Sequence, residues 1–431
     1  MRVLIVSQCF PPDPEVGSLR AAKVCEALAG ARHEVHVVTA RLPGEVGAIR
    51  VAGARITVHT VSAIPHPRKV YLLAKKWFGR NGTSPGPEAA ALGAEGRTPA
   101  WKRYLLSLLW LPDEHHGFIL PALWSCWRIY RRARIDLLYT TAPPFSTHLA
   151  GMLFNWMTGL PWAAEFRDPW SDNSKPASFR SRVSDAVERR LERWCLTRAD
   201  YVVSATDAIH QLLAQKVRPG PHRRFVVARN GIDRLTAPRR STSAPGCLRI
   251  VHAGSLYHGR DPRPFFHALA DLRRKGKLEE HEVRVDFVGD DRWFGGVSLE
   301  QVVQDLGLTS MVQFRGWLPH DACLELLEQA HVLLLLAQDQ PAQVPNKLFE
   351  YLGARKPILA FADAHGEVAH MLNRVGGHYL VTPGDPSRAE QALEAALCDA
   401  RAGTGGHTDE QVLREWTTEQ QMRRLLVALQ A

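Results

Sequence analysis

Residues 344–361 read VPNKLFEYLGARKPILAF, and this stretch decides the fold. The pair Pro345-Asn346 can start a helix, because proline is tolerated in the first helical turn. Four apolar side chains follow and indicate that this helix packs against a core: Leu348, Phe349, Tyr351 and Leu352. The short apolar run at 357–361 then predicts a buried strand. A helix followed at once by a buried strand is the repeating step of an α/β domain.

The same alternation continues through the second half of the chain. Helical patterns such as Asp321–Gln329 separate apolar runs of strand length: Leu248–Ala253, Arg284–Val288, Val312–Arg315, Val332–Ala337 and Pro357–Phe361. Residues 233–247 are rich in Pro, Ser, Thr and Arg, which is typical of a connection between domains. We therefore place a linker at 231–247, a second domain at 248–408 and a C-terminal helix at 409–431 that could cap either domain.

The first half of the chain opens with a βαβ pattern. Arg2–Ser7 and His33–Thr39 predict buried strands, and Ser18 can cap the helix between them, which runs to about Ala29. Further elements follow the same pattern: strands at Asp136–Thr140, Trp162–Phe166 and Tyr201–Ser204, and a charged helix at Arg182–Thr197. Residues 1–230 therefore form a first α/β domain. Because ligands of parallel sheets bind at the carboxyl ends of the strands, we expect a ligand in a cleft between the two domains.

Length and composition agree with two globular domains. The chain has 431 residues, of which 45% are hydrophobic and 23% charged. Its seven cysteines are scattered and form no CxxC pair, which favours free thiols in a reducing compartment. The first residues read as a strand and not as a signal peptide, and no apolar run approaches the ~20 residues of a membrane span. We expect a cytoplasmic protein, with residues 82–100 as a mobile loop.

Charge is unevenly distributed along the chain. Residues 1–230 contain 32 Lys+Arg and 18 Asp+Glu, a net of +14, whereas residues 231–431 contain 22 and 26, a net of −4. Three segments of the first half combine Trp and Leu with Lys or Arg: 68–80, 101–111 and 123–134. Such segments suit the surface of an anionic membrane, and the alternative is that their apolar residues fill the core of the first domain. A peripheral contact with the inner face of the cell membrane is therefore one of the two interpretations of these segments.

Several blocks in the second half carry a family resemblance. They are VHAGSLYHGRDPRPF (251–265), VGDD (288–291), DLGL (305–308), VQFRGWLPHDACLELLEQAHVLLLL (312–336) and VPNKLFEYLGARKPILAF (344–361). With these blocks the chain resembles the retaining glycosyltransferases of family 4. Their GT-B fold is an α/β architecture in which two Rossmann-like domains face each other across a cleft.

The resemblance implies a reaction. A sugar would pass from a nucleotide-diphosphate sugar, with UDP the first choice and GDP the second, to a hydroxyl of a glycan or lipid-linked acceptor, with retention of configuration. The donor would be held mainly by the second domain and the acceptor by the first. No cofactor and no nucleic acid is implied, and the pathway is one of polysaccharide, cell-envelope or natural-product glycosylation.

Donor-site candidates lie in the blocks of the second half. Gly254 follows a strand, where a small residue lets backbone approach a phosphate. Arg260 stands where the family usually has a lysine, and either cation would stabilise the departing diphosphate. Lys347 and Glu350 share one helix face; in similar enzymes the position of Glu350 holds the ribose hydroxyls, and the turn at Asn346 lies over the sugar and diphosphate. The alternatives are surface ion pairs.

Two departures from the family pattern affect this region. Relatives often have two glutamates in this segment, and the position of the first holds Ala342 here, which leaves Asp339 or Gln343 as substitutes. Ser255 stands where many relatives have an arginine and remains a substrate-binding candidate. In the family both positions face the sugar and diphosphate, so these departures leave the donor sugar unassigned.

The first half contributes candidates for the acceptor side. Gly17 would let backbone amides meet the diphosphate, or else would merely start a helix. Asp168 would bind or deprotonate the acceptor hydroxyl, with Arg167 paired to it or to phosphate, and the alternative is a structural Asp–Arg pair. The cluster Asp113–His116 holds metal-ligand types, but adjacent loop residues cannot easily face one ion, and no Asp-x-Asp occurs. We therefore expect a metal-independent enzyme.

Three rival functions make different demands on the sequence. A nucleotide-sugar epimerase of the same fold would need no acceptor. A nicotinamide-dependent oxidoreductase should carry G-x-G-x-x-G after its first strand, but residues 7–12 read SQCFPP. A nucleic-acid binder would need a reading motif beside its basic residues, and none is recognisable.

Overall fold

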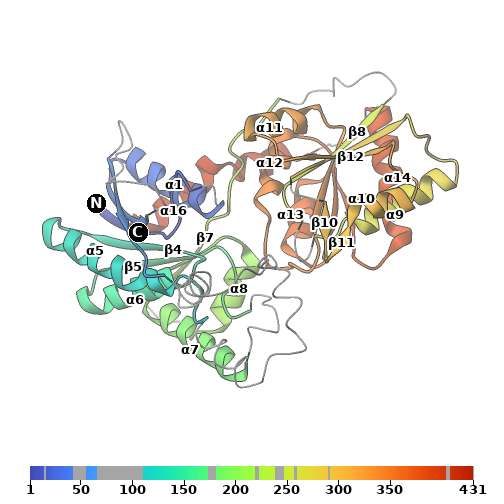
Figure 1. Ribbon diagram of the computed structural model, residues 1–431. Helices are drawn as coiled ribbons and strands as arrows, with labels where there is room; N and C mark the ends of the chain where they lie inside the picture. Colours follow the sequence, from blue (N-terminus) through green and yellow to red (C-terminus); the bar gives the residue numbers. More distant parts are fainter. Residues whose placement is uncertain are drawn as a thin grey trace. The chain divides into compact units, whose positions relative to one another are not determined.

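The computed structural model describes residues 1–13, 16–41, 55–65, 110–172, 181–218, 223–237, 247–256, 260–289, 292–403 and 408–430. The segment 68–80, the loop at 82–100 and all but the last two residues of 101–111 lie outside these ranges. Two compact units make up the chain (Figure 1). Unit 1 contains residues 1–228 and 422–431, and unit 2 contains residues 229–421.

Unit 1 is built on a seven-stranded parallel sheet in the order β3-β2-β1-β4-β5-β6-β7. The strands are β1 (Arg2–Val6), β2 (Glu34–Ala40), β3 (Ile56–Val61), β4 (Leu137–Ala142), β5 (Trp162–Phe166), β6 (Tyr201–Ser204) and β7 (Arg224–Val227). Every residue of β4 and β5 is buried, which explains their apolar sequences, since helices cover both faces of a parallel sheet.

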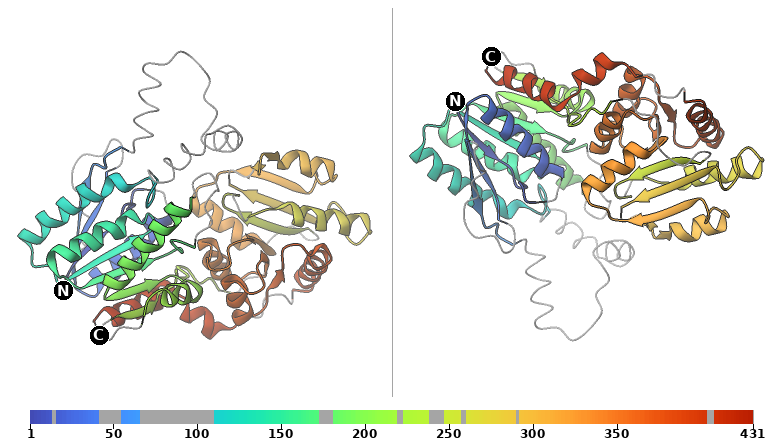
Figure 2. Two further views of the ribbon diagram at one scale, coloured as in Figure 1. Left: turned by 90° about the horizontal axis from the view of Figure 1, so that it is seen from below. Right: turned by 90° about the horizontal axis from the view of Figure 1, so that it is seen from above.

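The helices of unit 1 lie in two layers. They are α1 (Val16–Gly30), α5 (Ile119–Arg132), α6 (Ser146–Thr158), α7 (Arg182–Arg198) and α8 (Asp207–Gln215), with a 3₁₀ turn, η1, at His116–Phe118. Apolar residues of α1 share one core with the sheet and with the last helix of the chain. On the other face α6 packs against β4 and β5, with α5 and α7 on its two sides (Figure 2). Ser18, expected as a helix cap, lies inside the first turn of α1, because this helix begins at Val16.

Unit 2 holds a six-stranded parallel sheet in the order β12-β9-β8-β13-β14-β15. Its strands are β8 (Leu248–Ala253), β9 (Val283–Val288), β12 (Val312–Gly316), β13 (Val332–Ala337), β14 (Ile358–Ala362) and β15 (Tyr379–Val381), and a small hairpin joins β10 (Trp293–Phe294) to β11 (Val297–Ser298). The helices are α9 (Arg263–Arg274), α10 (Leu299–Asp305), α11 (His320–Gln329), α12 (Asn346–Ala354), α13 (Glu367–Val375), α14 (Pro386–Ala402) and α15 (Glu410–Glu415). Separate apolar cores on the two faces of the sheet make each unit a doubly wound domain.

The C-terminal segment forms two helices where we expected one. After α15 the chain turns at Trp416 and Thr417 and continues as α16 (Thr418–Gln430). Ile232 holds this turn, since its NH donates to Trp416 O (2.8 Å) and its carbonyl accepts from Thr418 N (3.0 Å). Within unit 2, the first part of the expected linker is therefore tied through Ile232 to the turn that follows α15. The far end of α16 adds three residues to the core of unit 1: Met422, Leu425 and Leu429.

Among the described residues, no helix is both long and apolar enough to span a bilayer.

Candidate functional site

The carboxyl edge of the unit 2 sheet brings Gly254 against Lys347. Gly254 follows β8 directly and has φ +106°, a backbone conformation that other residues rarely adopt. A Cβ at this position would lie 2.8 Å from Nζ and 3.0 Å from Cε of Lys347. Lys347 stands in the first turn of α12, so the glycine creates the space in which its ammonium lies. The approach of Gly254 to a phosphate stays a prediction, and the contact that the structure gives at this position is with the Lys347 side chain.

A buried histidine, His252, lies beneath this lysine. Its Nε2 is 3.4 Å from Nζ of Lys347, and its Nδ1 is 2.9 Å from Leu334 O. Burial lowers the pKa of His252 well below its ordinary value, and the nearby cations Lys347 and Arg260 lower it further. The imidazole is therefore neutral and carries one proton. Nδ1 faces Leu334 O, whereas Nε2 faces both the Lys347 ammonium and, at 3.1 Å, the carbonyl oxygen of Gly254.

Arg260 supplies a second cation at the same edge. Its side chain is only 8% exposed, and Nη1 donates to Ser255 O at 3.4 Å. The backbone carbonyl of Ser255 thus helps to hold the Arg260 side chain in place. Arg260 contacts Ser255 and the Lys347 ammonium lies against Gly254, so both cations lie against the residues that follow β8, and Lys347 is in the first turn of α12. Helix N-termini carry partial positive charge, and this arrangement favours an anionic ligand such as a diphosphate.

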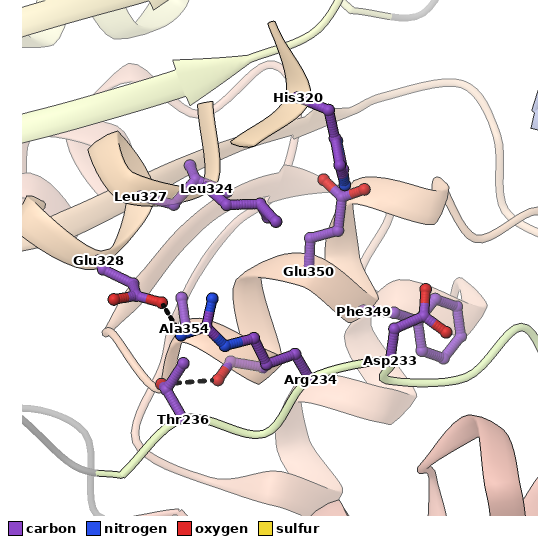
Figure 3. Close-up of a pocket in the computed structure, with 11 residues that line it drawn as sticks. Asp233, Arg234, Thr236, His320, Leu324, Leu327, Glu328, Phe349, Glu350 and Ala354 are labelled. Atoms are coloured by element: carbon purple, nitrogen blue, oxygen red, sulfur yellow. Dashed lines mark hydrogen bonds and ion pairs between the residues drawn. The ribbon is translucent and has the colours of Figure 1, made fainter. Parts of the chain in front are cut away.

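Glu350 lies one turn further along α12 and lines a cavity of about 60 Å³ (Figure 3). The other walls come from α11 and from residues 233–236, with Leu324, Leu327 and Phe349 as the apolar part of the lining. Figure 3 shows the carboxylate of Glu350 on the same side of the cavity as His320. Burial raises the pKa of the Cys323 thiol to about 11, and the nearby Glu350 carboxylate contributes to this rise. The thiol is protonated at neutral pH. A cavity of this volume is too small for a whole nucleotide.

Two backbone-level contacts shape the floor of this cavity. Gly353 lies against Arg234 O so closely that a Cβ there would overlap it, and Thr236 Oγ1 donates to Gly353 O at 2.9 Å. Arg234 also pairs with Glu328 at 3.5 Å, an interaction of exposed groups that adds little stability. These contacts keep residues 233–236 against α12, and they depend on glycine at 353.

The turn after β13 leads to Asp339 and Gln343, the two candidates to replace the missing glutamate. Gln338 is 5% exposed, and its Nε2 donates to Asp261 O at 2.7 Å. Its Oε1 is buried without a hydrogen-bond partner among the described residues. Asp339 follows with φ +56°, a strained conformation for a residue other than glycine. Whether Asp339 or Gln343 replaces the glutamate stays a prediction.

In unit 1, the carboxyl edge of the sheet brings Gly17 against Arg167. A Cβ at Gly17, in the first turn of α1, would overlap the Arg167 guanidinium. Nε of Arg167 donates to Ala142 O at 3.2 Å, and Nη2 donates to Pro143 O. The guanidinium is therefore anchored to the end of β4 and not available as a freely moving phosphate ligand. Asp168 follows it in sequence, half-buried at the end of β5.

A buried ion pair holds α1 to β5 behind these residues. Nε and Nη2 of Arg20 donate to Glu165 Oε1 at 2.8 and 2.7 Å, and Nη2 also donates to Ala228 O at 2.9 Å. Both side chains are almost wholly buried. His148 lies nearby against Phe166, with ring centroids 4.4 Å apart, and burial with the charge of Arg167 lowers its pKa to about 3. This neutral histidine and the ion pair position the loop that carries Arg167 and Asp168.

The segment 113–116 has a structural role. Asp113 Oδ2 accepts from Ser146 N, the first NH of α6, and Oδ1 accepts from His115 N, both at 2.9 Å. Gln8 Nε2 contacts His115 Nδ1. No group of three or more His, Cys, Asp or Glu side chains suited to a metal ion occurs among the described residues.

Sequence reasoning missed His252, Gln338 and the Arg20–Glu165 pair. A weak signal existed for His252, because a histidine interrupts the apolar run LRIVHA just before Gly254. A similar signal existed for Glu165, the polar residue within WAAEF. No local pattern connects Arg20 to Glu165, because 145 positions separate them.

Comparisons with known proteins match both units of the chain. Residues 17–231 match the glycosyl transferase 4-like domain, and residues 234–404 match the glycosyl transferases group 1 domain. The 2-deoxystreptamine glucosyltransferase of Streptomyces kanamyceticus is 22% identical over 302 residues, which cover 66% of this chain and 74% of that protein.

Solved structures show the same fold over the whole chain. Sucrose-phosphate synthase of Thermosynechococcus elongatus superposes with a TM-score of 0.63 at 15% identity, covering 100% of this chain and 97% of that one. The Anabaena protein Alr3699/HepE, in complex with UDP and glucose, superposes with a TM-score of 0.58 at 14% identity, covering 100% and 99%. Two α/β domains with parallel sheets, as in these proteins, confirm the predicted fold class.

Proposed function

Because this chain belongs to the GT-B glycosyltransferases, we propose that it transfers a sugar from a nucleotide-diphosphate sugar to a hydroxyl of a glycan or lipid-linked acceptor. The observation that carries the donor assignment is the pair of cations against Gly254 and Ser255, namely Lys347, in the first turn of α12, and Arg260. UDP is our first choice of nucleotide, supported by the Anabaena protein solved with UDP and with UDP-glucose. GDP is the second choice.

In the proposed reaction the bond between the anomeric carbon and the diphosphate oxygen breaks. The electron pair stays on the departing diphosphate, while the acceptor oxygen bonds to the anomeric carbon on the same face and its proton leaves. Arg260 and Lys347 stabilise the charge that accumulates on the diphosphate. The neutral His252 supports this role, because it lies next to the Lys347 ammonium without adding a positive charge beneath it.

The remaining roles follow the positions of the side chains. Glu350, on the same helix face as Lys347, binds the ribose hydroxyls, since a carboxylate accepts two hydrogen bonds readily. Asn346 begins the helix beside the diphosphate. Asp168 binds or deprotonates the acceptor hydroxyl, and Arg167 fixes the loop on which it stands. Gly17, Gly254 and Ser255 supply backbone rather than side-chain chemistry.

We further propose that the enzyme is metal-independent and works in the cytoplasm, with a peripheral contact at the inner face of the cell membrane. The first proposal is supported by the two cations, which can take the charge-neutralising part that a metal ion has in other transferases. The second is supported by the basic first half of the chain and by its Trp- and Arg-rich segments. A role in polysaccharide or cell-envelope synthesis would follow from a lipid-linked acceptor.

A thermal-shift screen with UDP, GDP, dTDP, ADP and NAD, without added metal, tests the donor site. One nucleoside diphosphate should raise the melting temperature of the wild type, by about 2–4 °C if it is present at 100 times its Kd, and not that of Glu350→Ala. A matched control is Glu394→Ala, which removes an exposed glutamate that pairs with Lys277 at 2.7 Å on the surface of unit 2. A shift with NAD alone, or an equal shift in Glu350→Ala and wild type, would contradict the assignment.

A further inference from the structure

The outer helix layer of unit 1 exposes a set of large apolar side chains. Four are tryptophans, with exposed fractions of 61% (Trp124), 36% (Trp127), 68% (Trp156) and 46% (Trp194), and Leu120 and Met157 are exposed in the same layer. Single exposed apolar residues are ordinary in soluble proteins. Six exposed apolar side chains on three neighbouring helices indicate an interaction surface. We name these six residues the tryptophan face.

The three helices that carry this face form one layer of unit 1. Helix α6 packs against α5 on one side and α7 on the other, and all three lie on the sheet face opposite to α1 and α16 (Figures 1 and 2). Each is followed after a short connection by the start of a strand, β4, β5 or β6. Their C-terminal turns therefore lie at the amino edge of the sheet. Trp156 is in the last turn of α6, and Trp127 and Trp194 are in the C-terminal halves of α5 and α7, on the side away from the carboxyl edge where Arg167 and Asp168 lie.

Positive charge dominates the same layer, in which Asp185 of α7 is a partly exposed acidic residue. The exposed charged side chains of α5 and α7 are all arginines: Arg128, Arg131, Arg132, Arg182, Arg189, Arg190, Arg193 and Arg198. The glutamates of α7, Glu188 and Glu192, are buried and point away from solvent. Helix α6 contains no Asp, Glu, Lys or Arg. The layer therefore presents a cationic surface around its tryptophans, which complements a surface of negative charge.

Two of the arginines lie directly over indole rings. The guanidinium carbon of Arg128 is 4.5 Å from the ring centroid of Trp124, and that of Arg190 is 5.0 Å from the ring of Trp194. Stacking holds each guanidinium at the level of its tryptophan and leaves its NH groups directed sideways. An apolar ring and a phosphate-binding fork at one depth match the boundary between acyl chains and headgroups of a bilayer.

We propose that the tryptophan face docks unit 1 on an anionic lipid surface. Arginines would bind the headgroup phosphates, and the tryptophans would enter the interfacial region, where amphipathic rings are favoured. A nucleic acid would use the arginines, but would leave Leu120 and Met157 without a function. This proposal deepens the membrane contact that belongs to the proposed function. It is tested by binding alone, so that failure to bind lipid and failure to transfer sugar are separate results.

Co-sedimentation with vesicles measures the proposed contact. Full-length protein is mixed at low salt with vesicles of phosphatidylcholine, or of phosphatidylcholine and phosphatidylglycerol. The wild type should bind the anionic vesicles and leave the neutral ones, and added salt should weaken binding. Three double variants are compared: Arg131→Ala/Arg132→Ala, Trp127→Ser/Trp156→Ser, and the control Arg274→Ala/Trp293→Ser, which removes equally exposed side chains from unit 2. Circular dichroism and UDP thermal shift confirm that each variant is folded.

The expected effects differ between the variants. Loss of two arginines should lower the partition coefficient about 25-fold, since each basic residue near the surface contributes about five-fold. Loss of two tryptophans should lower it about 10-fold or more, as for apolar side chains leaving an apolar environment. The control should bind as the wild type does. Equal binding to neutral and anionic vesicles, no binding at all, or loss in the arginine variant with none in the tryptophan variant would overturn the proposal, the last by showing plain polycation behaviour.

Discussion

Replacement of Gly254 by alanine should weaken nucleotide binding through Lys347. The new Cβ would lie 2.8 Å from the Lys347 ammonium, closer than such atoms approach, so the lysine must move. Displacement would cost one charge-assisted hydrogen bond to the diphosphate, worth about 1.5–3 kcal/mol. The Kd for UDP, or for whichever nucleoside diphosphate binds, should therefore rise about 10- to 150-fold, because 1.4 kcal/mol corresponds to a factor of ten.

A second cost of this substitution concerns stability and must be separated from the first. At φ +106° a non-glycine residue is strained by about 1–3 kcal/mol, whatever it contacts. Gly276→Ala is the matched control, because Gly276 also has positive φ (+67°) and has no atom within 4 Å of its Cβ position. Urea unfolding should show comparable losses of stability in both variants. Only Gly254→Ala should lose affinity in isothermal titration calorimetry.

The two measurements also define the refuting result. If both glycine variants bind the nucleotide as tightly as the wild type does, the Lys347 ammonium does not contact the diphosphate. If both lose affinity equally, the effect comes from backbone strain in unit 2 and not from the lysine. Either outcome would remove the observation on which the donor site rests.

Four further changes test other parts of the structure. Glu165→Gln leaves the buried Arg20 without its charged partner and should lower the free energy of unfolding by about 3–5 kcal/mol, whereas Lys277→Met, in an exposed pair, should leave the urea midpoint almost unchanged; similar midpoints in the two variants would contradict this. Asp168→Asn should lower kcat about 10²- to 10⁴-fold with an unchanged Kd for the nucleotide, and a change in Kd alone would move Asp168 to the donor side. The pKa of His148 is about 3 in the folded state and roughly 6.5 in the unfolded state, so between these values only the unfolded state binds the proton. The free energy of unfolding therefore falls with decreasing pH, by up to ~1.4 kcal/mol per pH unit. His148→Gln should flatten that slope in urea titrations from pH 6 to 4. EDTA should leave the transfer rate unchanged, and a large loss of activity restored by a divalent cation would disprove metal independence.

Local sequence patterns determined the secondary structure of both units. Trp162–Phe166, Tyr201–Ser204 and Val332–Ala337 form strands with the bounds that their apolar runs predict. These strands are central or buried on both faces, so burial alone selects their residues. Three strands nearer the sheet edges, β3, β7 and β15, were not anticipated, because their residues are only partly buried and mix polar with apolar side chains.

Only the tertiary structure decided which charged and polar residues meet. His252 lies 95 positions before Lys347, and Arg20 lies 145 positions before Glu165. A sequence pattern reports neighbours along one helix or strand, whereas these pairs depend on how strands are ordered in a sheet. The neutral state of His252 likewise follows from burial among cations, which no local pattern contains. Residue types at Gly254, Arg260 and Lys347 therefore indicated an anion site, and the fold alone placed the three together, because the carboxyl ends of parallel strands converge on one edge.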